Sequence, residues 1–401
     1  MSAVVVIGGG QAGLAVSHEL AGAGIDHVVL ERDRVAQAWR DRWDSFTLVT
    51  PNWTLRLPGS AYAGEDRAGH VDRDTVVAFL QDYADHHAGP VREGVAVHEV
   101  ARGTTSRLRL RTSEGDVDAD TVVVCTGAFQ RPHLPTVAAS LTPGPVVLDA
   151  TGYRRPGDLP DGRVLLVGSG QTGIQLAEEL HLAGREVVLA CGRAPWAPRR
   201  LDGVDIATWL ERAGFFDQPL SALGSPAARL LSNIQTTGAG GGHDLHYRVL
   251  QEMGVTLAGR LQGVSAGRVD FADDLAESVA FGDARLADLD RLLRDKLGRE
   301  APEVPRPEPF VADPPRRARL ADFAAVVFTS GFRPDYARWV RLPVFDADGF
   351  PLTNHDLSTA VPGLFFCGVH FLRNRRSSLV WGVGDDAQVV VRTIVREHGW
   401  G

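Results

Sequence analysis

Two stretches of the chain share the glycine spacing G-x-G-x-x-G, each placed after a short apolar run and before an amphipathic stretch. Their members are Gly8, Gly10 and Gly13 in the first stretch and Gly168, Gly170 and Gly173 in the second, with Gln11 and Gln171 after the middle glycines. Glycines at this spacing let the backbone turn tightly and approach a pyrophosphate, whose charge the N-terminus of the next helix stabilises. The spacing therefore predicts two dinucleotide-binding loops in one chain.

One acidic residue distinguishes the two stretches. Glu31 ends the strand expected after the first loop, where a carboxylate accepts hydrogen bonds from ribose hydroxyls. Cys191 stands at this place in the second stretch, and three arginines follow it: Arg193, Arg199 and Arg200. A carboxylate repels a ribose 2′-phosphate and a guanidinium attracts it, so we expect FAD in the first site and NADPH in the second. The alternative for Arg193 is an ordinary solvated surface arginine.

Two dinucleotides in one chain imply hydride transfer from a nicotinamide to a flavin. A disulfide reductase would then need a redox-active cysteine pair beside the flavin. The three cysteines, Cys125, Cys191 and Cys367, are far apart in the sequence and form no C-x-x-C pair, so we interpret them as small core residues. This leaves oxygen as the expected electron acceptor.

The elements that must position the loops form two strand–helix–strand units, at residues 4–31 and 163–190. Further strands are expected at 95–100, 107–112, 121–125 and within 321–335, helices at 74–87, 204–213, 284–300 and 385–398, and an irregular proline-rich segment at 301–315. The sequence predicts an α/β fold with two Rossmann-type dinucleotide-binding domains, the NADPH domain inserted in the FAD domain. We place the FAD domain at 1–157 and 319–401, and the NADPH domain at 158–318.

The composition restricts the partners. A chain of 401 residues is too long for one ordinary core, which agrees with two domains. The net charge of −8 argues against a nucleic-acid partner. No apolar run reaches the roughly 18 residues of a membrane span, no leader is recognised before the first strand, and no H-E-x-x-H spacing indicates a metal. We therefore expect no membrane span and no metal in a cytoplasmic protein, and leave a homodimer open.

Longer motifs extend over nearly the whole chain: GGGQAGLA, VVVCTGAFQRPHLP, YRRPGDLPDGRVLLVGSGQTG, FTSGFRPD and PGLFFCG followed by SSLVWGVGDDA. With them the chain resembles the class B flavoprotein monooxygenases, which include flavin-containing monooxygenases, plant indole-pyruvate monooxygenases and bacterial relatives often labelled potassium-transport flavoproteins. The resemblance implies tightly bound FAD, NADPH as reductant, and oxygenation of a small organic molecule by a flavin C4a-hydroperoxide formed from molecular oxygen.

The chain departs from one motif of this family. The fingerprint F-x-G-x-x-x-H-x-x-x-Y aligns with PGPVVLDATGY, between the two glycine loops. Only Tyr153 matches, because Asp149 stands at the histidine position and Pro143 at the phenylalanine position. This departure favours the bacterial branch, and leaves open whether the flavin inserts oxygen or only reduces it.

Further cofactor-binding residues follow from the loops and the resemblance. They are Arg32 after the ribose acid, Trp39 in a segment similar to the family's flavin-covering segment, Thr126 and Gly127 at a strand end facing the pyrophosphate, and Gly368. Residues 382–385 then start a helix whose N-terminus favours the anionic reduced ring. Tryptophan packing, a simple strand-to-loop turn and an ordinary capped helix are the competing interpretations.

Asn52 is the candidate catalytic residue. It lies in TPNW, where the family places a polar side chain near the flavin ring. A carboxamide there holds peroxide or NADP by hydrogen bonds without titrating. The competing interpretation is a local turn after Pro51.

Three functions remain on the sequence alone. The first is an NADPH-consuming monooxygenase, the second an NADPH-dependent reductase or oxidase without oxygen insertion, and the third a redox sensor that responds to nucleotide occupancy. The substrate is not identified, because loops around the flavin determine it in this fold. Arginines at 316–319 and 373–376 are compatible with an anionic substrate or with simple solvation.

Overall fold

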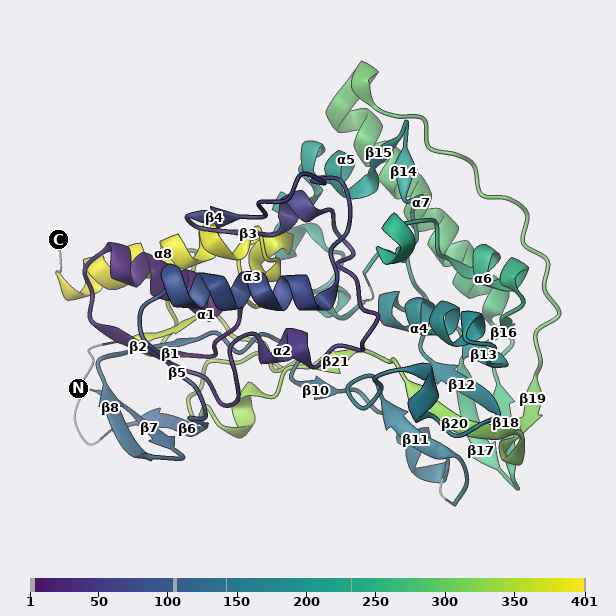
Figure 1. Ribbon diagram of the computed structural model, residues 1–401, viewed down its shortest axis with the longest axis horizontal. Coiled ribbons are helices and arrows are strands. Elements are labelled where there is room, and N and C mark those ends of the chain that lie inside the picture. Colours follow the sequence, from purple (N-terminus) through teal and green to yellow (C-terminus); the bar gives the residue numbers. More distant parts are fainter. Residues whose placement is uncertain (1–3, 104–106, 142, 232, 400–401) are drawn as a thin grey trace.

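Two parallel sheets lie side by side in the computed structural model, one in each half of the molecule (Figure 1). The structure describes residues 4–103, 107–141, 143–231 and 233–399. In spatial order, the first sheet contains β22 (Leu364–Phe366), β9 (Thr121–Val124), β1 (Val4–Ile7), β2 (His27–Leu30) and β5 (Val91–Arg92). The second contains β11 (Val146–Asp149), β20 (Phe323–Phe328), β12 (Arg163–Val167), β13 (Val187–Ala190) and β16 (Thr256–Ala258). Every neighbouring pair in both sheets is parallel.

The second sheet repeats the first strand for strand. β12 precedes the second glycine loop as β1 precedes the first, and β13, β16 and β20 take the places of β2, β5 and β9. Each unit also carries a three-stranded antiparallel sheet after its fifth strand: β6 (Val97–Arg102), β7 (Leu108–Thr112) and β8 (Gly115–Ala119), then β17 (Leu261–Ser265), β18 (Arg268–Phe271) and β19 (Arg317–Arg319). The predicted fold class, an α/β chain with two Rossmann-type domains, is confirmed.

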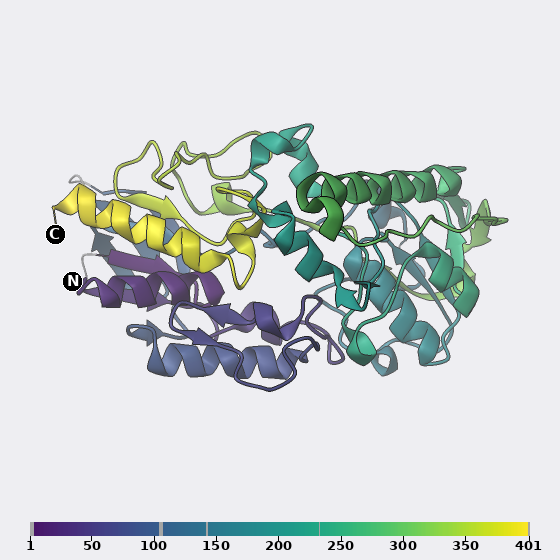
Figure 2. The same ribbon diagram turned by 90° about the horizontal axis from the view of Figure 1, so that it is seen from above.

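Helices cover the first sheet. α1 (Gln11–Gly22) lies between α8 (Val383–His398) and α3 (Arg73–His86), as Figure 2 shows. The β1 side chains alternate between two cores, Val4 and Val6 packing with the α1 helix and Val5 and Ile7 with the opposite side. Because both faces of the sheet are buried, β1 is an uninterrupted apolar run.

The remaining elements are short or belong to the second unit. They are α2 (Gln37–Arg40), α4 (Gln171–Leu182), α5 (Ile206–Arg212), α6 (Tyr247–Met253), α7 (Leu275–Leu297), β3 (Arg56–Leu57), β4 (Ser60–Ala61), β10 (Arg131–Pro132), β14 (Arg200–Leu201), β15 (Val204–Asp205) and β21 (Phe332–Arg333). α7 begins nine residues before the predicted helix at 284–300, and α3 is capped by Asp72, whose carboxylate accepts the Thr75 N–H.

The strand pairing moves the domain boundaries. β11 and β20 pair with each other, and β20 pairs with β12, so residues 146–149 and 323–328 belong to the second sheet. The predicted boundaries at 157/158 and 318/319 would separate the edge strand β11 and its neighbour β20 from the other three strands of this sheet. The crossing between domains occurs instead near the antiparallel pair β10 and β21. No described helix is both long and apolar enough to cross a membrane.

Candidate cofactor and active site

The first glycine loop is closed so tightly that side chains are excluded. Gly8 has a φ of +109°, and a Cβ on Gly13 would lie 1.8 Å from the Gly8 carbonyl oxygen. The second loop has the same geometry, with a φ of +108° at Gly168 and 1.9 Å between a Cβ on Gly173 and the Gly168 carbonyl oxygen. Only glycine fits at these four positions.

Both loops leave a helix N-terminus open. α1 and α4 begin after Gly10 and Gly170, neither helix has a side-chain cap, and neither first turn contains an acidic residue. A Cβ on Gly10 would meet no atom within 4 Å, so space remains in front of the first backbone N–H groups. Unsatisfied N–H groups and the helix dipole favour an anion at such a place. The residues therefore fit a pyrophosphate at each loop.

The ribose acid of the first site is held in place. The Glu31 carboxylate accepts hydrogen bonds from the N–H groups of Gly9 at 2.6 Å and Asp33 at 2.9 Å, at the end of β2. Arg32 points away and pairs with Asp33 at 2.8 Å, with 74 % of its side chain exposed. Arg32 would therefore contact a bound adenosine only from the solvent-exposed side of the site.

Trp39 connects the loop to two other elements. Its indole N–H donates to Gln11 Oε1 at 3.0 Å, and Gln11 Nε2 donates to the Ser378 carbonyl at 3.4 Å. Ser378 ends a short turn before α8. Trp39, Gln11 at the start of α1 and the turn before α8 therefore lie together around the carboxyl ends of the strands in the first sheet.

The other residues predicted to bind FAD also lie at the carboxyl ends of these strands. Val124 of β9 lies opposite Phe366 of β22, so the residues that follow these strands are neighbours. Thr126 is exposed there, and the Gly127 carbonyl accepts from the Tyr336 hydroxyl at 2.6 Å. Gly368 has a φ of +79°, and a Cβ on it would lie 2.4 Å from Cβ of Ala12. In open α/β sheets, ligands bind outside the carboxyl ends of the strands where chain direction diverges, here between β1 and β9.

The second site contains a hydroxyl pair that sequence reasoning missed. The Ser169 hydroxyl lies 2.5 Å from the Tyr247 hydroxyl and accepts from the Gly192 N–H at 2.8 Å. Tyr247 also donates to the Gly192 carbonyl. Burial raises the pKa of Tyr247, so the phenol stays protonated. No sequence spacing links Tyr247 to the loop, whereas Ser169 lies inside the motif.

The place of the missing acid is apolar and neutral. Cys191 is completely buried at the end of β13, and burial raises the pKa of its thiol. Two residues later Arg193 is exposed. Arg193 therefore presents a guanidinium close to the place that Glu31 takes in the first unit.

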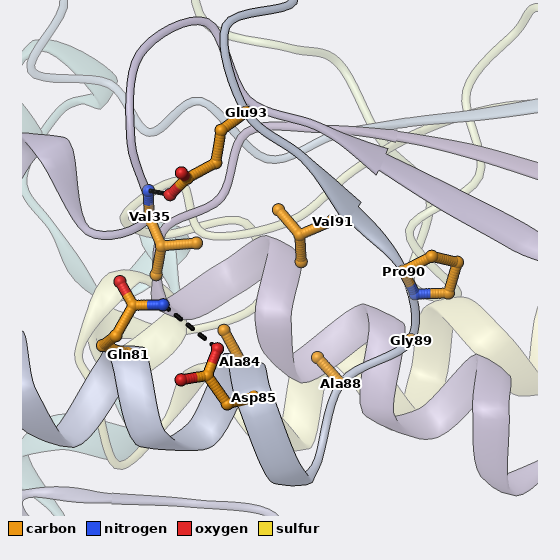
Figure 3. A pocket seen from close by; sticks show the side chains of 9 residues that line it. All are labelled: Val35, Gln81, Ala84, Asp85, Ala88, Gly89, Pro90, Val91 and Glu93. Atoms are coloured by element: carbon orange, nitrogen blue, oxygen red, sulfur yellow. Dashed lines mark hydrogen bonds between the residues drawn. The ribbon is translucent and has the colours of Figure 1, made fainter.

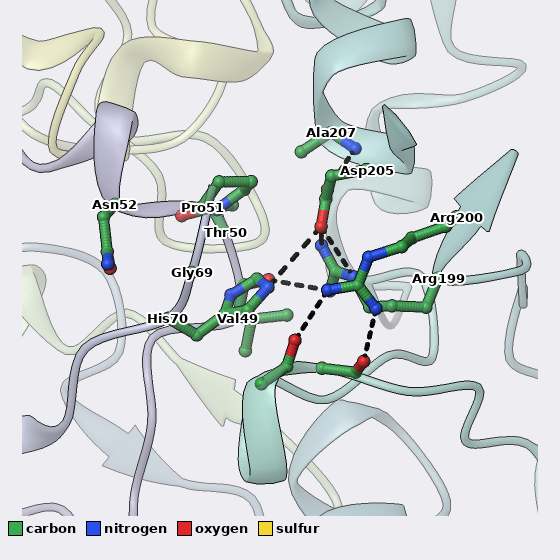
Figure 4. Close-up of polar contacts among 12 residues, drawn as sticks. Val49, Thr50, Pro51, Asn52, Gly69, His70, Arg199, Arg200, Asp205 and Ala207 are labelled. Atoms are coloured by element: carbon green, nitrogen blue, oxygen red, sulfur yellow. Dashed lines mark hydrogen bonds and ion pairs between the residues drawn. The ribbon is translucent and has the colours of Figure 1, made fainter. Parts of the chain in front are cut away.

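Arg199 does not have the predicted role. Its guanidinium is 2 % exposed, and Nε donates to Asp205 at 2.8 Å while another nitrogen donates to the Val49 carbonyl at 2.9 Å (Figure 4). A group committed in this way cannot turn to a 2′-phosphate. Arg200 is exposed and donates to the carbonyls of Gly241 and Gly242, both at 2.7 Å.

Asn52 also has a structural contact in place of the predicted catalytic one. It is 2 % exposed, its Nδ2 donates to the Asp66 carbonyl at 2.8 Å, and its Oδ1 accepts the Val71 N–H at 2.6 Å. Both ends of the carboxamide therefore hold the loop that follows β4. The local-turn interpretation does not account for these two contacts either, because their partners lie 14 and 19 residues away in the sequence. Asn52 also lies apart from the Arg199 contacts (Figure 4).

The arginines before α8 differ in their partners. Arg373 pairs with Asp386 at 3.2 Å, and Arg376 pairs with Asp217 at 2.6 Å. Arg375 lies between the rings of Phe215 and Phe371, with its carbon Cζ 4.1 and 5.0 Å from their centres. Burial lowers the pKa of Arg375 to about 10, although the guanidinium remains charged near neutrality.

Two further features carry less chemistry. A groove between α3 and β5 is lined by polar groups that already pair: Glu93 accepts the Val35 N–H at 2.7 Å, and Asp85 accepts from Gln81 at 3.2 Å (Figure 3). Within the described ranges, no group of three or more histidine, cysteine, aspartate or glutamate side chains is placed to hold a metal ion.

The doubled sheet, its two open helix N-termini and the single ribose acid define a flavin- and pyridine-nucleotide-dependent oxidoreductase. A family model described as pyridine nucleotide-disulphide oxidoreductase matches residues 5–212, about half of the chain, and the chain belongs to this family. The comparisons also support a flavin-dependent oxidoreductase with FAD and NADPH as cofactors, similar to the flavin-containing monooxygenases.

Individual relatives share the full length. The chain is 28 % identical over 396 residues, 98 % of each chain, to an uncharacterized CzcO-like oxidoreductase of Geobacillus kaustophilus (strain HTA426). A flavin-containing monooxygenase from Stenotrophomonas maltophilia has the same fold, with a TM-score of 0.68, 21 % identity and 99 % of both chains covered. An ornithine N-hydroxylase from Kutzneria sp. 744, solved with reduced FAD, NADP⁺ and L-ornithine, has a TM-score of 0.66 at 16 % identity, covering 99 % of this chain and all of that one.

Proposed function

We propose that this enzyme is an NADPH-consuming monooxygenase that transfers one oxygen atom of O₂ to a small organic molecule. FAD supplies the hydride acceptor and the oxygen-activating centre when it is bound. The residues that would hold it are the first glycine loop, Glu31, Trp39 and the strand ends at Thr126 and Gly368. NADPH would be held by the second loop, with Arg193 at the 2′-phosphate.

The state of the cysteines carries this proposal. Cys125 and Cys367 follow the neighbouring strands β9 and β22, so the fold brings their thiols close together, which their distance in the sequence concealed. They are only 5 % and 0 % exposed, and the Cys125 contact and burial raise the pKa of the Cys367 thiol. A thiol relay needs an accessible thiolate. The burial of both thiols favours oxygen over a disulfide as the acceptor.

The test is a product balance on the FAD-loaded enzyme. NADPH oxidation is followed with amines, sulfides, ketones and indoles, and the product is analysed after reaction under ¹⁸O₂. We expect at least one class to accelerate NADPH oxidation and to carry one labelled oxygen atom. Hydrogen peroxide equal to NADPH with every class supports the reductase or oxidase alternative. Negligible turnover despite bound FAD supports the sensor.

A further inference from the structure

We infer that Arg199, Asp205 and His70 form an interdomain cluster that positions the NADPH domain for hydride transfer to the flavin. The three are positioning residues and bind neither nucleotide. The inference rests on the proposed use of NADPH to reduce FAD. In that step NADPH loses one hydride, which consists of a proton and two electrons, and the flavin gains this hydride.

The cluster joins the two domains through a single carboxylate. Asp205 Oδ2 accepts from Arg199 Nε at 2.8 Å and lies 3.5 Å from His70 Nε2 (Figure 4). Its other oxygen accepts the Ala207 N–H at 2.8 Å, which caps α5. His70 comes from the FAD domain, and its Nδ1 lies 3.0 Å from the Leu48 carbonyl.

Arg199 makes a second link across the same boundary. It donates to the Val49 carbonyl of the FAD domain at 2.9 Å and to the Thr237 carbonyl of its own domain at 3.4 Å. Its backbone N–H is held by Asp244 at 2.5 Å. One guanidinium therefore binds the FAD-domain backbone and the NADPH-domain carboxylate together.

The surfaces around the cluster fit without spare room. A Cβ on Gly238 would lie 2.2 Å from the Leu48 carbonyl oxygen. A Cβ on Gly242 would lie 2.9 Å from His70 Nε2 and 3.1 Å from Arg199 Cδ. These glycines let the loop at 236–243 come into close contact with the backbone of the FAD domain. A side chain at either position would push the two domains apart.

Burial makes the cluster sensitive to domain position. The side chains of Arg199, Asp205 and His70 are 2 %, 6 % and 0 % exposed. Burial alone would raise the pKa of Asp205, but the contact with His70 and the Arg199 charge hold it below its usual value. A small rotation would leave a charge without its partner in a poorly solvated place. The docked arrangement is thereby favoured over neighbouring ones.

Hydride transfer depends on this docking because donor and acceptor atoms must approach to about 3–3.5 Å, and an error of roughly 1 Å slows such a reaction about 100-fold. NADPH affinity depends on the second loop within one domain. Disturbing the cluster should thus slow flavin reduction and leave binding unchanged.

The experiment uses Arg199→Met in the FAD-loaded enzyme. We expect anaerobic flavin reduction by NADPH to slow by about 10-fold or more, with the NADPH dissociation constant changed less than about twofold. Without any nucleotide added, hydrogen exchange should increase in segments 48–70 and 236–243. Arg199→Lys, which keeps the charge, should recover part of the rate. Arg291→Met, which removes an exposed ion pair with Asp288 on α7 inside the NADPH domain, is the control and should change neither rate nor exchange.

Two results overturn the inference. A loss of NADPH affinity with NADH binding unchanged would make Arg199 a 2′-phosphate ligand, and an unchanged reduction rate would make the cluster irrelevant to transfer. If Arg199→Met does not fold, His70→Gln keeps the Arg199–Asp205 pair and decides by the same two measurements. A wild-type enzyme whose FAD is not reduced by NADPH would contradict the proposed function itself.

Discussion

Arg193 and Arg199 carry the same group, but only Arg193 is exposed beside the second glycine loop. We expect Arg193→Gln to weaken NADPH binding about 10-fold or more, because one charged contact to the 2′-phosphate is lost. NADH binding should stay nearly unchanged, since NADH has no such phosphate. Titration of both nucleotides by calorimetry checks this, and equal losses for both would contradict it.

Glu31 makes the corresponding difference at the first site. Glu31→Gln removes the charge that accepts ribose hydroxyls but keeps the shape that fits the Gly9 N–H. FAD binding should weaken by about 1.5–3 kcal/mol, the range for a charged hydrogen bond. The measurement is recovery of flavin fluorescence on dilution, with the exposed Glu114→Gln as control. FAD retention equal to the wild type would remove Glu31 from the site.

Residue types and spacing predict these two roles, which stay predictions, while the structure gives two other candidate residues different contacts. Glu31 and Arg193 follow loop motifs at a spacing that local geometry preserves. Arg199 was assigned from its distance to the second loop in the sequence, and Asn52 from the family resemblance. Their partners in the structure include Val49 for Arg199 and Val71 for Asn52, and both contacts come from loop packing. Burial of that kind has no signature in sequence.

Among the elements, α1 offers an internal comparison. A Cβ on Gly13 would lie 1.8 Å from the Gly8 oxygen, whereas one on Gly22 of the same helix would meet nothing within 4 Å. We therefore expect Gly13→Ala to push the helix from β1 and to abolish FAD retention. Gly22→Ala should keep FAD and change stability by no more than about 1 kcal/mol in the favourable direction. FAD content and thermal midpoints distinguish the two, and a normal FAD content in Gly13→Ala would contradict the loop geometry.

The first turn of α8 contains a titrating group. Burial raises the pKa of Asp386 to about 6, against the Ser377 hydrogen bond and the Arg373 charge. A raised carboxyl pKa means that the contribution of Asp386 to stability is greatest below pH 3.8 and is lost as the pH rises through 6, by about 1.4 kcal/mol per unit in between. Asp386→Asn should remove this slope from urea unfolding, and the exposed Asp385→Asn should retain it. Equal slopes in wild type and Asp386→Asn would show that burial of Asp386 is not linked to stability.

Strand positions were predicted better than their partners. The buried runs at 121–125 and within 321–335 were recognised as similar, and β9 and β20 do occupy equivalent places. The sequence did not show that β20 enters between β11 and β12, because parallel pairing is decided by distant contacts and not by local pattern. The domain boundaries were therefore misplaced, although the doubled fold was correctly predicted.

In the whole molecule, the duplication separates two tasks that one sheet could not perform together. Each unit offers one pyrophosphate site, and the cluster at Arg199 holds the units in one register. In the proposed reaction, electrons would enter at the second unit, cross the domain boundary and leave from the first. The two neighbouring thiols of the described residues, beside β9 and β22, lie buried, which favours oxygen as the acceptor in this proposal.

The last prediction tests whether the two buried thiols take part in electron transfer to the acceptor. Cys125→Ser with Cys367→Ser removes both thiols and preserves their volume, so the FAD-loaded double variant should oxidise NADPH with oxygen within about twofold of wild type if neither thiol takes part in the transfer. Oxygen uptake and NADPH loss measured together check this, with cystine and oxidised glutathione as added acceptors. We expect neither disulfide to accelerate NADPH oxidation in either protein. Loss of turnover with FAD retained, together with acceleration of the wild type by a disulfide, would instead make the buried pair an electron relay.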